Sequence, residues 1–70
     1  MTLEQLRGRS GLSQREIAEK MKVAITTISN WENAVSTPRT PMIKPLAEAL
    51  GATIVEVYEA IEETQKHHST

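Results

Sequence analysis

The chain has 70 residues and no cysteine, and its nine acidic residues outnumber its eight basic ones to give a formal net charge of −1. That length suits one domain with a small core, and the lack of cysteine excludes a disulfide framework and a cysteine nucleophile. The neighbouring His67 and His68 are too few for a four-ligand metal site, and no apolar run is long enough to span a membrane. We therefore expect a cytoplasmic protein that binds no metal or cofactor.

Two helices near the N-terminus begin with the same capping signature. Thr2 can cap a first helix whose third residue, Gln5, reaches back to it. Ser13 and Glu16 repeat this pattern with stronger capping residues and start a second helix, which should end at about Lys22. Since no glycine is present at that end, Lys22 has to adopt the turn conformation that glycine takes freely.

A third helix, over residues 25–33, is predicted to have an apolar side and an uncharged polar side. The helical wheel turns Ala24, Ile28 and Trp31 inward, so we interpret Trp31 as a core residue rather than one that stacks on a base. The opposite side carries hydroxyl and amide side chains: Thr26, Ser29, Asn30 and Asn33. Solvated helices usually carry Glu and Lys there, so this face indicates a binding surface.

Two further helices complete the chain. Thr40 is expected to cap the fourth, in which Pro45 either introduces a kink or marks where regular pairing begins. Thr53 is expected to cap the fifth, whose glutamates form a solvated face. The predicted inner stripe of the fifth helix has four members: Ile54, Val57, Tyr58 and Ile61. We expect one folded domain over residues 1–64 and a frayed tail over residues 65–70.

The charge is unevenly distributed between the two parts of the chain. Residues 1–44 hold seven Lys or Arg and four Glu, a net charge of +3, whereas residues 45–70 carry −4. The overall charge therefore hides a mildly basic front half. Five short helices without a strand pattern predict an all-α fold, a compact five-helix bundle. The turn between the second and third helices is too short for antiparallel packing, so these two should cross steeply, and the small Ala18 allows their close approach.

Five short motifs follow one another along the chain: Leu6-Arg7, Gly11-Leu12-Ser13-Gln14, Ile17-Ala18-Glu19-Lys20, Thr27-Ile28-Ser29-Asn30-Trp31-Glu32-Asn33 and Leu46-Ala47-Glu48-Ala49-Leu50-Gly51. In this order and spacing, residues 3–58 resemble the helix-turn-helix domain of the lambdoid phage repressor and Cro type, called XRE-like. The resemblance implies a lambda-repressor-like DNA-binding domain, in which residues 25–33 form the recognition helix that enters the major groove.

Three positions depart from the usual pattern of that family. Ala24 stands where these proteins have Ser or Thr, so the recognition helix lacks a capping hydroxyl worth about 1 kcal/mol. Lys22 and Ala34 stand where the family usually has glycine. We expect these three departures to leave the fold intact but to lower its free energy of unfolding.

The resemblance also implies roles for individual side chains. The candidates for reading bases are Ile25, Thr26, Ser29 and Asn30. The candidates for contacting phosphates that match the family are Ser13, Gln14, Thr27, Asn33 and Arg39. Lys22, which departs from the family pattern, is a further candidate because it adds a cation close to the expected phosphates. Arg7 and Glu32 are expected to form a structural ion pair. The candidates for a dimer surface are Met42, Ile43 and Val55. Because Asn can pair with adenine and the Ile25 side chain can contact the thymine methyl, half-sites rich in A·T are expected.

The function implied is that of a sequence-specific transcriptional regulator bound to double-stranded DNA, with no enzymatic activity. We expect a repressor that binds a pseudo-palindromic operator as a homodimer, with half-sites about 34 Å apart, and that is nucleoid-associated when bound. Neither a membrane nor a small-molecule effector is expected as a partner. The alternative is a protein-binding module of the same fold, for example an antitoxin that binds a toxin and its own promoter.

Overall fold

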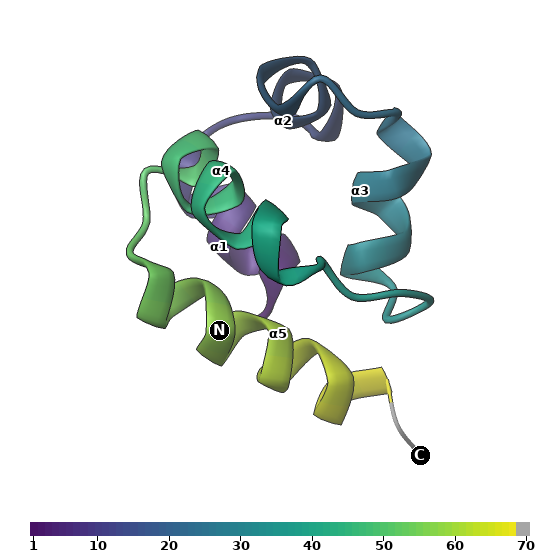
Figure 1. Cartoon of the computed structure of the whole chain (residues 1–70). Helices are drawn as coiled ribbons and strands as arrows, with labels where there is room; N and C mark the ends of the chain where they lie inside the picture. Colours follow the sequence, from purple (N-terminus) through teal and green to yellow (C-terminus); the bar gives the residue numbers. More distant parts are fainter. Residues whose placement is uncertain (69–70) are drawn as a thin grey trace.

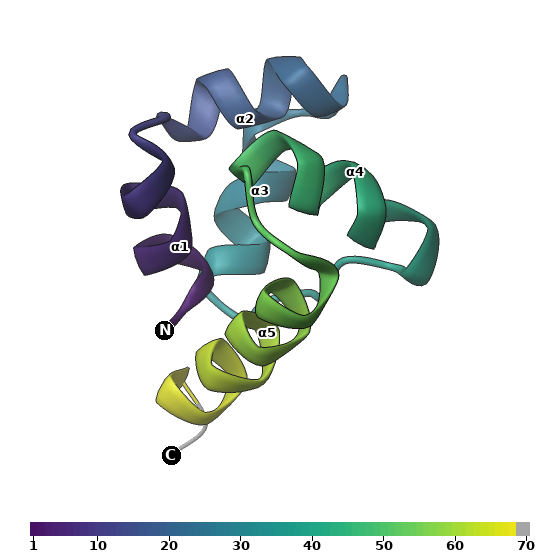
Figure 2. The same cartoon turned by 90° about the vertical axis from the view of Figure 1, so that its left-hand side faces the viewer.

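The computed structural model describes residues 1–68, in which it places five α-helices and no strand (Figure 1). In chain order these are α1 (Leu3–Ser10), α2 (Gln14–Met21), α3 (Ile25–Glu32), α4 (Thr40–Leu50) and α5 (Ile54–His68). The helix α2 packs against α3 and α4, while α5 packs against α1 and α4. In both views α2 and α5 lie on opposite sides of the molecule (Figure 1 and Figure 2). The predicted all-α bundle is confirmed.

The capping boxes of α1 and α2 form as predicted. Thr2 Oγ1 accepts from the backbone N–H of Gln5 at 3.2 Å, and Gln5 Oε1 accepts from the N–H of Thr2 at 2.9 Å. Ser13 and Glu16 make the same reciprocal bonds at 3.1 Å and 2.9 Å, and the backbone N–H of Ser13 lowers the pKa of the Glu16 carboxyl. Both starts are therefore determined by contacts between residues three positions apart.

The start of α3 differs in one respect from the prediction. Ala24 gives no side-chain cap, as expected, but its side chain is exposed rather than turned inward. Its backbone is extended, with φ −70° and ψ 148°, so it precedes the helix and the helical wheel does not place it. At this residue, therefore, neither a capping hydroxyl nor a core contact stabilises the first turn of α3.

Two residues with side chains adopt the left-handed conformation at helix ends. Lys22 follows α2 and Ala34 follows the end of α3, each with φ 59°. The backbone N–H of Lys22 donates to the carbonyls of Ala18 and Glu19, which closes α2. A residue with a Cβ atom is disfavoured in this conformation by roughly 1–2 kcal/mol, so both turns lower the stability of the fold.

Replacing Lys22 by Gly is expected to raise the free energy of unfolding by about 0.5–1 kcal/mol, because glycine takes the left-handed conformation without strain but gains more freedom in the unfolded chain. Urea unfolding followed by circular dichroism measures the change. The matched control is Lys22→Ala, which keeps the Cβ atom and should give no such gain. An equal gain in both variants would mean that the lysine charge, rather than the backbone, causes the strain.

The helix α4 begins one residue earlier than predicted. Arg39, not Thr40, is its N-cap, and its guanidinium has no acceptor with which to cap the helix. Pro41 occupies the second helical position and has no N–H, so no acceptor is needed there. Pro45 lies inside α4, on its exposed side. Its missing N–H would have bonded to the carbonyl of Pro41, and Pro41 is an exposed residue as well. The proline is therefore accommodated within the helix.

The inner face of α5 differs from the predicted stripe. It consists of Val57 (0% exposed), Ala60 (1%) and Thr64 (1%). Ile54 and Tyr58 are instead 46% and 49% exposed, so their predicted inward position is wrong. Thr64 Oγ1 accepts from the backbone N–H of Leu3 at 2.9 Å and donates to the Ala60 carbonyl at 2.8 Å. The start of α1 thus docks on small side chains of α5, which allow close approach, and the larger apolar ones lie beside this contact.

The same helix also extends further than predicted. Residues 65–68 are helical as part of α5, where we expected fraying. Thr64 anchors the helix one turn before its end, and Lys66 Nζ pairs with Glu62 Oε1 at 3.3 Å. Residues 69–70 of the predicted tail lie outside the described residues. The contact with α1 therefore carries helical structure beyond the boundary expected at residue 64.

An exposed ion pair joins the end of α1 to the start of α5. Arg9 Nη1 and Nη2 donate to the two carboxylate oxygens of Glu56 at 2.8 Å and 3.2 Å. Thr53 and Glu56 also form the expected capping box, with both bonds at 3.0 Å. The Arg9 guanidinium, followed by the backbone N–H of Thr53, lowers the pKa of the Glu56 carboxyl from 4.5 to about 2.

Stability is expected to fall as the pH drops through the range in which Glu56 titrates. Because its pKa is lower in the folded protein than in the unfolded chain, its contribution is complete above about pH 4.5 and is lost towards pH 2. Arg9→Met should raise the Glu56 pKa towards its ordinary value and reduce this acid-dependent loss. NMR titration of the carboxyl carbon measures the pKa, with Arg15→Met as the control. An unchanged Glu56 pKa in Arg9→Met would contradict the assignment.

Candidate nucleic-acid interface

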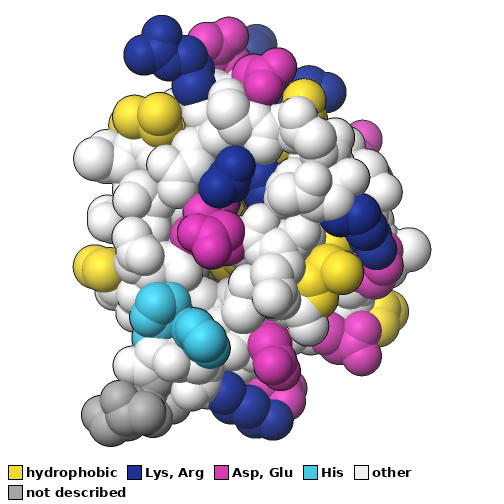
Figure 3. Space-filling model, turned by 180° about the vertical axis from the view of Figure 1, so that it is seen from behind, with side chains coloured by type: hydrophobic (Ala, Val, Ile, Leu, Met, Phe, Trp, Pro, Cys, Tyr) yellow, Lys and Arg dark blue, Asp and Glu magenta, His cyan; other side chains and the backbone are white. Residues whose placement is uncertain are grey.

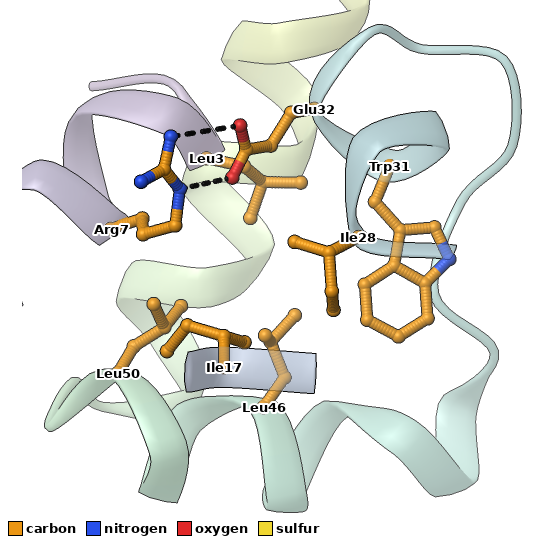
Figure 4. A pocket seen from close by; sticks show the side chains of 8 residues that line it. All are labelled: Leu3, Arg7, Ile17, Ile28, Trp31, Glu32, Leu46 and Leu50. Atoms are coloured by element: carbon orange, nitrogen blue, oxygen red, sulfur yellow. Dashed lines mark hydrogen bonds and ion pairs between the residues drawn. The ribbon is translucent and has the colours of Figure 1, made fainter. Parts of the chain in front are cut away.

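The inner side of α3 is held against the rest of the bundle. Ile28 and Trp31 are 3% and 6% exposed and extend from α3 into the core (Figure 4). The backbone N–H of Val23 donates to the Ala18 carbonyl at 3.0 Å, which closes the turn between α2 and α3. Ala18 itself is 4% exposed. The predicted core positions of Trp31 and Ala18 are confirmed, and the opposite side of α3 faces solvent.

That outer side of α3 is polar but uncharged. Thr26 and Asn30 are exposed, Thr27 and Ser29 are partly buried, and Ile25 at the start of the helix is 46% exposed. The first turn has no acidic residue and the last turn has no basic one. Along the middle of the left edge of Figure 3, the side on which α3 lies, white and yellow groups cover the surface, with Lys or Arg above them and His below.

The base-reading candidates differ in how free their side chains are. Within residues 1–68, the side chains of Thr26 and Asn30 have no hydrogen-bond partner, whereas Ser29 Oγ accepts from Asn33 Nδ2 at 3.3 Å. The backbone carbonyl of Asn30 accepts from the N–H of Val35 at 2.9 Å and so ties the following loop to α3. Val35 is 71% exposed next to this helix end. The sequence analysis did not select it, because an apolar residue in a loop carries no periodic signal.

The phosphate candidates at the start of α2 are partly engaged with the protein itself. Ser13 Oγ takes part in the capping box described above. The Gln14 side chain is partly buried, and its Nε2 donates to Glu32 Oε1 at 2.9 Å. An amide nitrogen carries two hydrogens, so Gln14 keeps a second N–H that could reach a phosphate. The sequence did not predict the bond to Glu32, which joins the start of α2 to the end of α3.

The expected ion pair between Arg7 and Glu32 is present. Arg7 Nε donates to Glu32 Oε2 at 2.6 Å, and Arg7 Nη2 donates to Glu32 Oε1 at 3.3 Å (Figure 4). Arg7 Nη1 also donates to the carbonyl of Leu12 at 3.1 Å. The side chains are 20% and 5% exposed, and the hydrogen bond with Glu32 raises the pKa of Arg7. The pair thus connects α1 with the loop before α2 and with the end of α3.

The basic side chains of residues 1–44 fall into two groups, those in ion pairs and those without one among the described residues. Arg7 and Arg9 are held by carboxylates. Five others are exposed and have no ion pair within residues 1–68: Arg15, Lys20, Lys22, Arg39 and Lys44. The sequence analysis selected only Lys22 and Arg39 of these. All five are available to attract the phosphate backbone, and their exposure was not evident from charge counts alone.

The three predicted dimer residues differ in how exposed they are. Val55 is 66% exposed, but Ile43 is 3% exposed, so its predicted place on an exposed surface is wrong. Met42 is partly buried against the core. Both lie on the side of α4 that packs against neighbouring helices, among them α2 and α5. Ile54 and Tyr58 lie beside Val55 on the first turns of α5 and are about half exposed. We refer to Ile54, Val55 and Tyr58 as the α5 patch.

Neither the paired histidines nor the void in the core forms a further site. The rings of His67 and His68 lie 5.3 Å apart in an edge-to-face arrangement, and no group of three or more His, Asp or Glu within residues 1–68 could hold a metal ion. The void beside Trp31 and the Arg7–Glu32 pair in Figure 4 has a volume of about 10 Å³, which is too small for a ligand. No helix in the described part of the chain is long and apolar enough to cross a membrane.

A family model described as Helix-turn-helix matches residues 3–57. This span runs from α1 to the start of α5 and includes all the candidates for DNA contact. No curated protein and no solved structure matches the chain significantly. The family match agrees with the motifs in the sequence and with the steep crossing of α2 and α3, since α2 is seen end-on in Figure 1 while α3 runs vertically. The chain therefore belongs to the XRE-type helix-turn-helix family of DNA-binding regulators.

Proposed function

We propose that this DNA-binding regulator recognises a specific operator by placing α3 in the major groove and represses transcription by occupying that site. The observation that carries the proposal is the exposed, uncharged polar face of α3, on which Thr26 and Asn30 have no partner within residues 1–68. The Asn30 amide can form two hydrogen bonds with adenine, and the exposed Ile25 can contact a thymine methyl. The preferred half-sites are therefore rich in A·T.

Attraction to the phosphate backbone comes from outside α3. The proposed phosphate contacts are Ser13, Gln14, Lys22, Thr27, Asn33 and Arg39. Lys22 and Arg39 add positive charge, while the others supply neutral donors that fix the register of α3 on the duplex. The helix α5, whose sequence includes four glutamates, lies on the side of the molecule opposite α2 (Figure 1 and Figure 2). This asymmetry directs the front half of the domain towards DNA.

The α5 patch is the proposed contact between two copies of the chain. Its three apolar side chains are exposed next to one another on one helix, where a symmetric partner would bury them. A two-fold dimer would present two α3 helices to a pseudo-palindromic operator, with half-sites about 34 Å apart. Among the predicted dimer residues, Val55 remains part of this proposal.

Selection from a pool of randomised duplexes tests the proposed recognition. We expect enrichment of an inverted repeat with A·T-rich half-sites and binding of two chains per duplex by analytical ultracentrifugation. Binding that depends on salt but enriches no motif would contradict specific reading of bases. Placing the enriched site across a promoter should lower transcript yield in a reconstituted reaction. A higher yield would contradict the repressor role.

The second candidate is an antitoxin that binds a protein partner and also its own promoter. The observation in its favour is the α5 patch, which could be covered by a different polypeptide instead of a second copy. Mixing the purified chain with the product of the neighbouring gene distinguishes the two. A stable complex that leaves the chain monomeric would favour the antitoxin, whereas a homodimer without such a complex would favour the operator-binding repressor.

A further inference from the structure

We infer that Glu32 positions the Gln14 side chain for its contact with a DNA phosphate, in addition to holding Arg7. This inference rests on the proposed phosphate contact of Gln14. The Glu32 side chain is 5% exposed, and both of its oxygens are used. Oε2 accepts from Arg7 Nε at 2.6 Å, while Oε1 accepts from Arg7 Nη2 at 3.3 Å and from Gln14 Nε2 at 2.9 Å. Gln14 is thus held by the same carboxylate that closes the structural pair.

The carboxylate decides which way the Gln14 amide faces. An ionised carboxylate only accepts hydrogen bonds, so the amide nitrogen of Gln14, and not its oxygen, must face Glu32. The remaining N–H and the amide oxygen have no partner within residues 1–68. A phosphate also only accepts, and it would be repelled by the amide oxygen. Fixing the amide therefore places a donor at one position and prevents the orientation that would oppose binding.

Arg7 allows the Glu32 carboxylate to orient the Gln14 amide close to the DNA. The charge of Glu32 alone would repel a phosphate, but the guanidinium of Arg7 bonds to both oxygens and balances it. Arg7 also holds the carbonyl of Leu12, which directly precedes the Ser13 cap of α2. This hydrogen-bond network therefore fixes the position of the start of α2 relative to the end of α3. The position of Gln14 on the duplex is coupled to that of the recognition helix.

A double-mutant cycle on DNA affinity tests the inference. The four proteins are the unchanged chain, Glu32→Gln, Gln14→Met and the double variant, measured by fluorescence anisotropy with a short duplex of arbitrary sequence at low salt. Glu32→Gln keeps the shape but lets the Gln14 amide flip, so it should weaken binding about three- to tenfold, the effect of one hydrogen bond. In the Gln14→Met background the same change should not weaken binding, because no Gln14 amide is left to reorient and the unbalanced Arg7 charge attracts phosphate. Coupling of this kind isolates the action of Glu32 through Gln14.

Two readouts separate positioning from a merely structural role. The measurements are made at a temperature at which circular dichroism shows every variant to be folded, with Thr64→Val as a destabilised control. Thr64 lies between α1 and α5, so its loss should lower stability and leave DNA affinity unchanged. The salt dependence should also stay the same in Gln14→Met, because a neutral amide releases no counterion.

The inference would be overturned if Glu32→Gln weakened DNA binding equally in the unchanged and the Gln14→Met backgrounds. It would also be overturned if Glu32→Gln weakened DNA binding in neither background. A chain that binds no duplex at all would instead refute the proposed function, so the two failures are distinguishable. If Glu32→Gln does not fold, NMR of the unchanged protein decides the question. One Gln14 side-chain amide proton should be protected from exchange with solvent, and two equally unprotected protons would overturn the inference.

Discussion

Replacing Arg7 by Met is expected to lower the free energy of unfolding by about 2–4 kcal/mol, which is a large share of the stability of a domain this small. The substitution keeps most of the aliphatic stem but removes the guanidinium. Glu32, whose side chain is 5% exposed, would then keep a buried negative charge with only the Gln14 amide as a partner. Leaving a buried charge without its counterion is far more costly than losing an exposed pair. Urea unfolding followed by circular dichroism measures the change.

The double variant Arg7→Met/Glu32→Met is the matched test of this cause. It removes the stranded charge as well as the ion pair, so it should regain much of the lost stability. Arg15→Met, which removes an exposed arginine that has no ion pair within residues 1–68, should change little. If the double variant is less stable than Arg7→Met alone, the buried charge is not the cause of the loss.

Replacing Asn30 by Ala is expected to remove the preference for one base pair of the operator. The loss for the best site should be about 1–3 kcal/mol, because two hydrogen bonds to one adenine would disappear. The Asn30 side chain is exposed and has no partner within residues 1–68, so the change should leave the stability of the fold almost unaltered. Repeating the duplex selection with the variant shows which position of the motif has lost its preference.

Gln14→Ala is the contrasting variant, since its proposed contact is with a phosphate. It should weaken binding to all sequences alike and leave the motif unchanged. If Asn30→Ala and Gln14→Ala have the same effect on the motif, the division into base-reading and phosphate-contacting residues is wrong. A single outcome of the selection therefore tests both assignments.

Much of the fold could be predicted from the sequence because it depends on contacts within one turn of helix. The capping boxes at Thr2, Ser13 and Thr53 each join residues three apart, and all three form. The left-handed turn at Lys22 was predicted in the same way, from the missing glycine. The family motifs added the pair between Arg7 and Glu32, which is present, and the proposal that α3 is the recognition helix.

The tertiary structure alone decided which side of α5 is buried and how distant polar groups meet. Thr64 bonds to Leu3 across most of the chain, Arg9 reaches Glu56, and Gln14 joins the carboxylate of Glu32. Hydrophobic periodicity gives the phase of a helix only approximately, and the neighbour that packs on it selects the final face. The sequence thus determined the helices, their starts and the polar face of α3. Packing between distant segments determined the exposed α5 patch and the orientation of the Gln14 amide, because neither depends on local contacts.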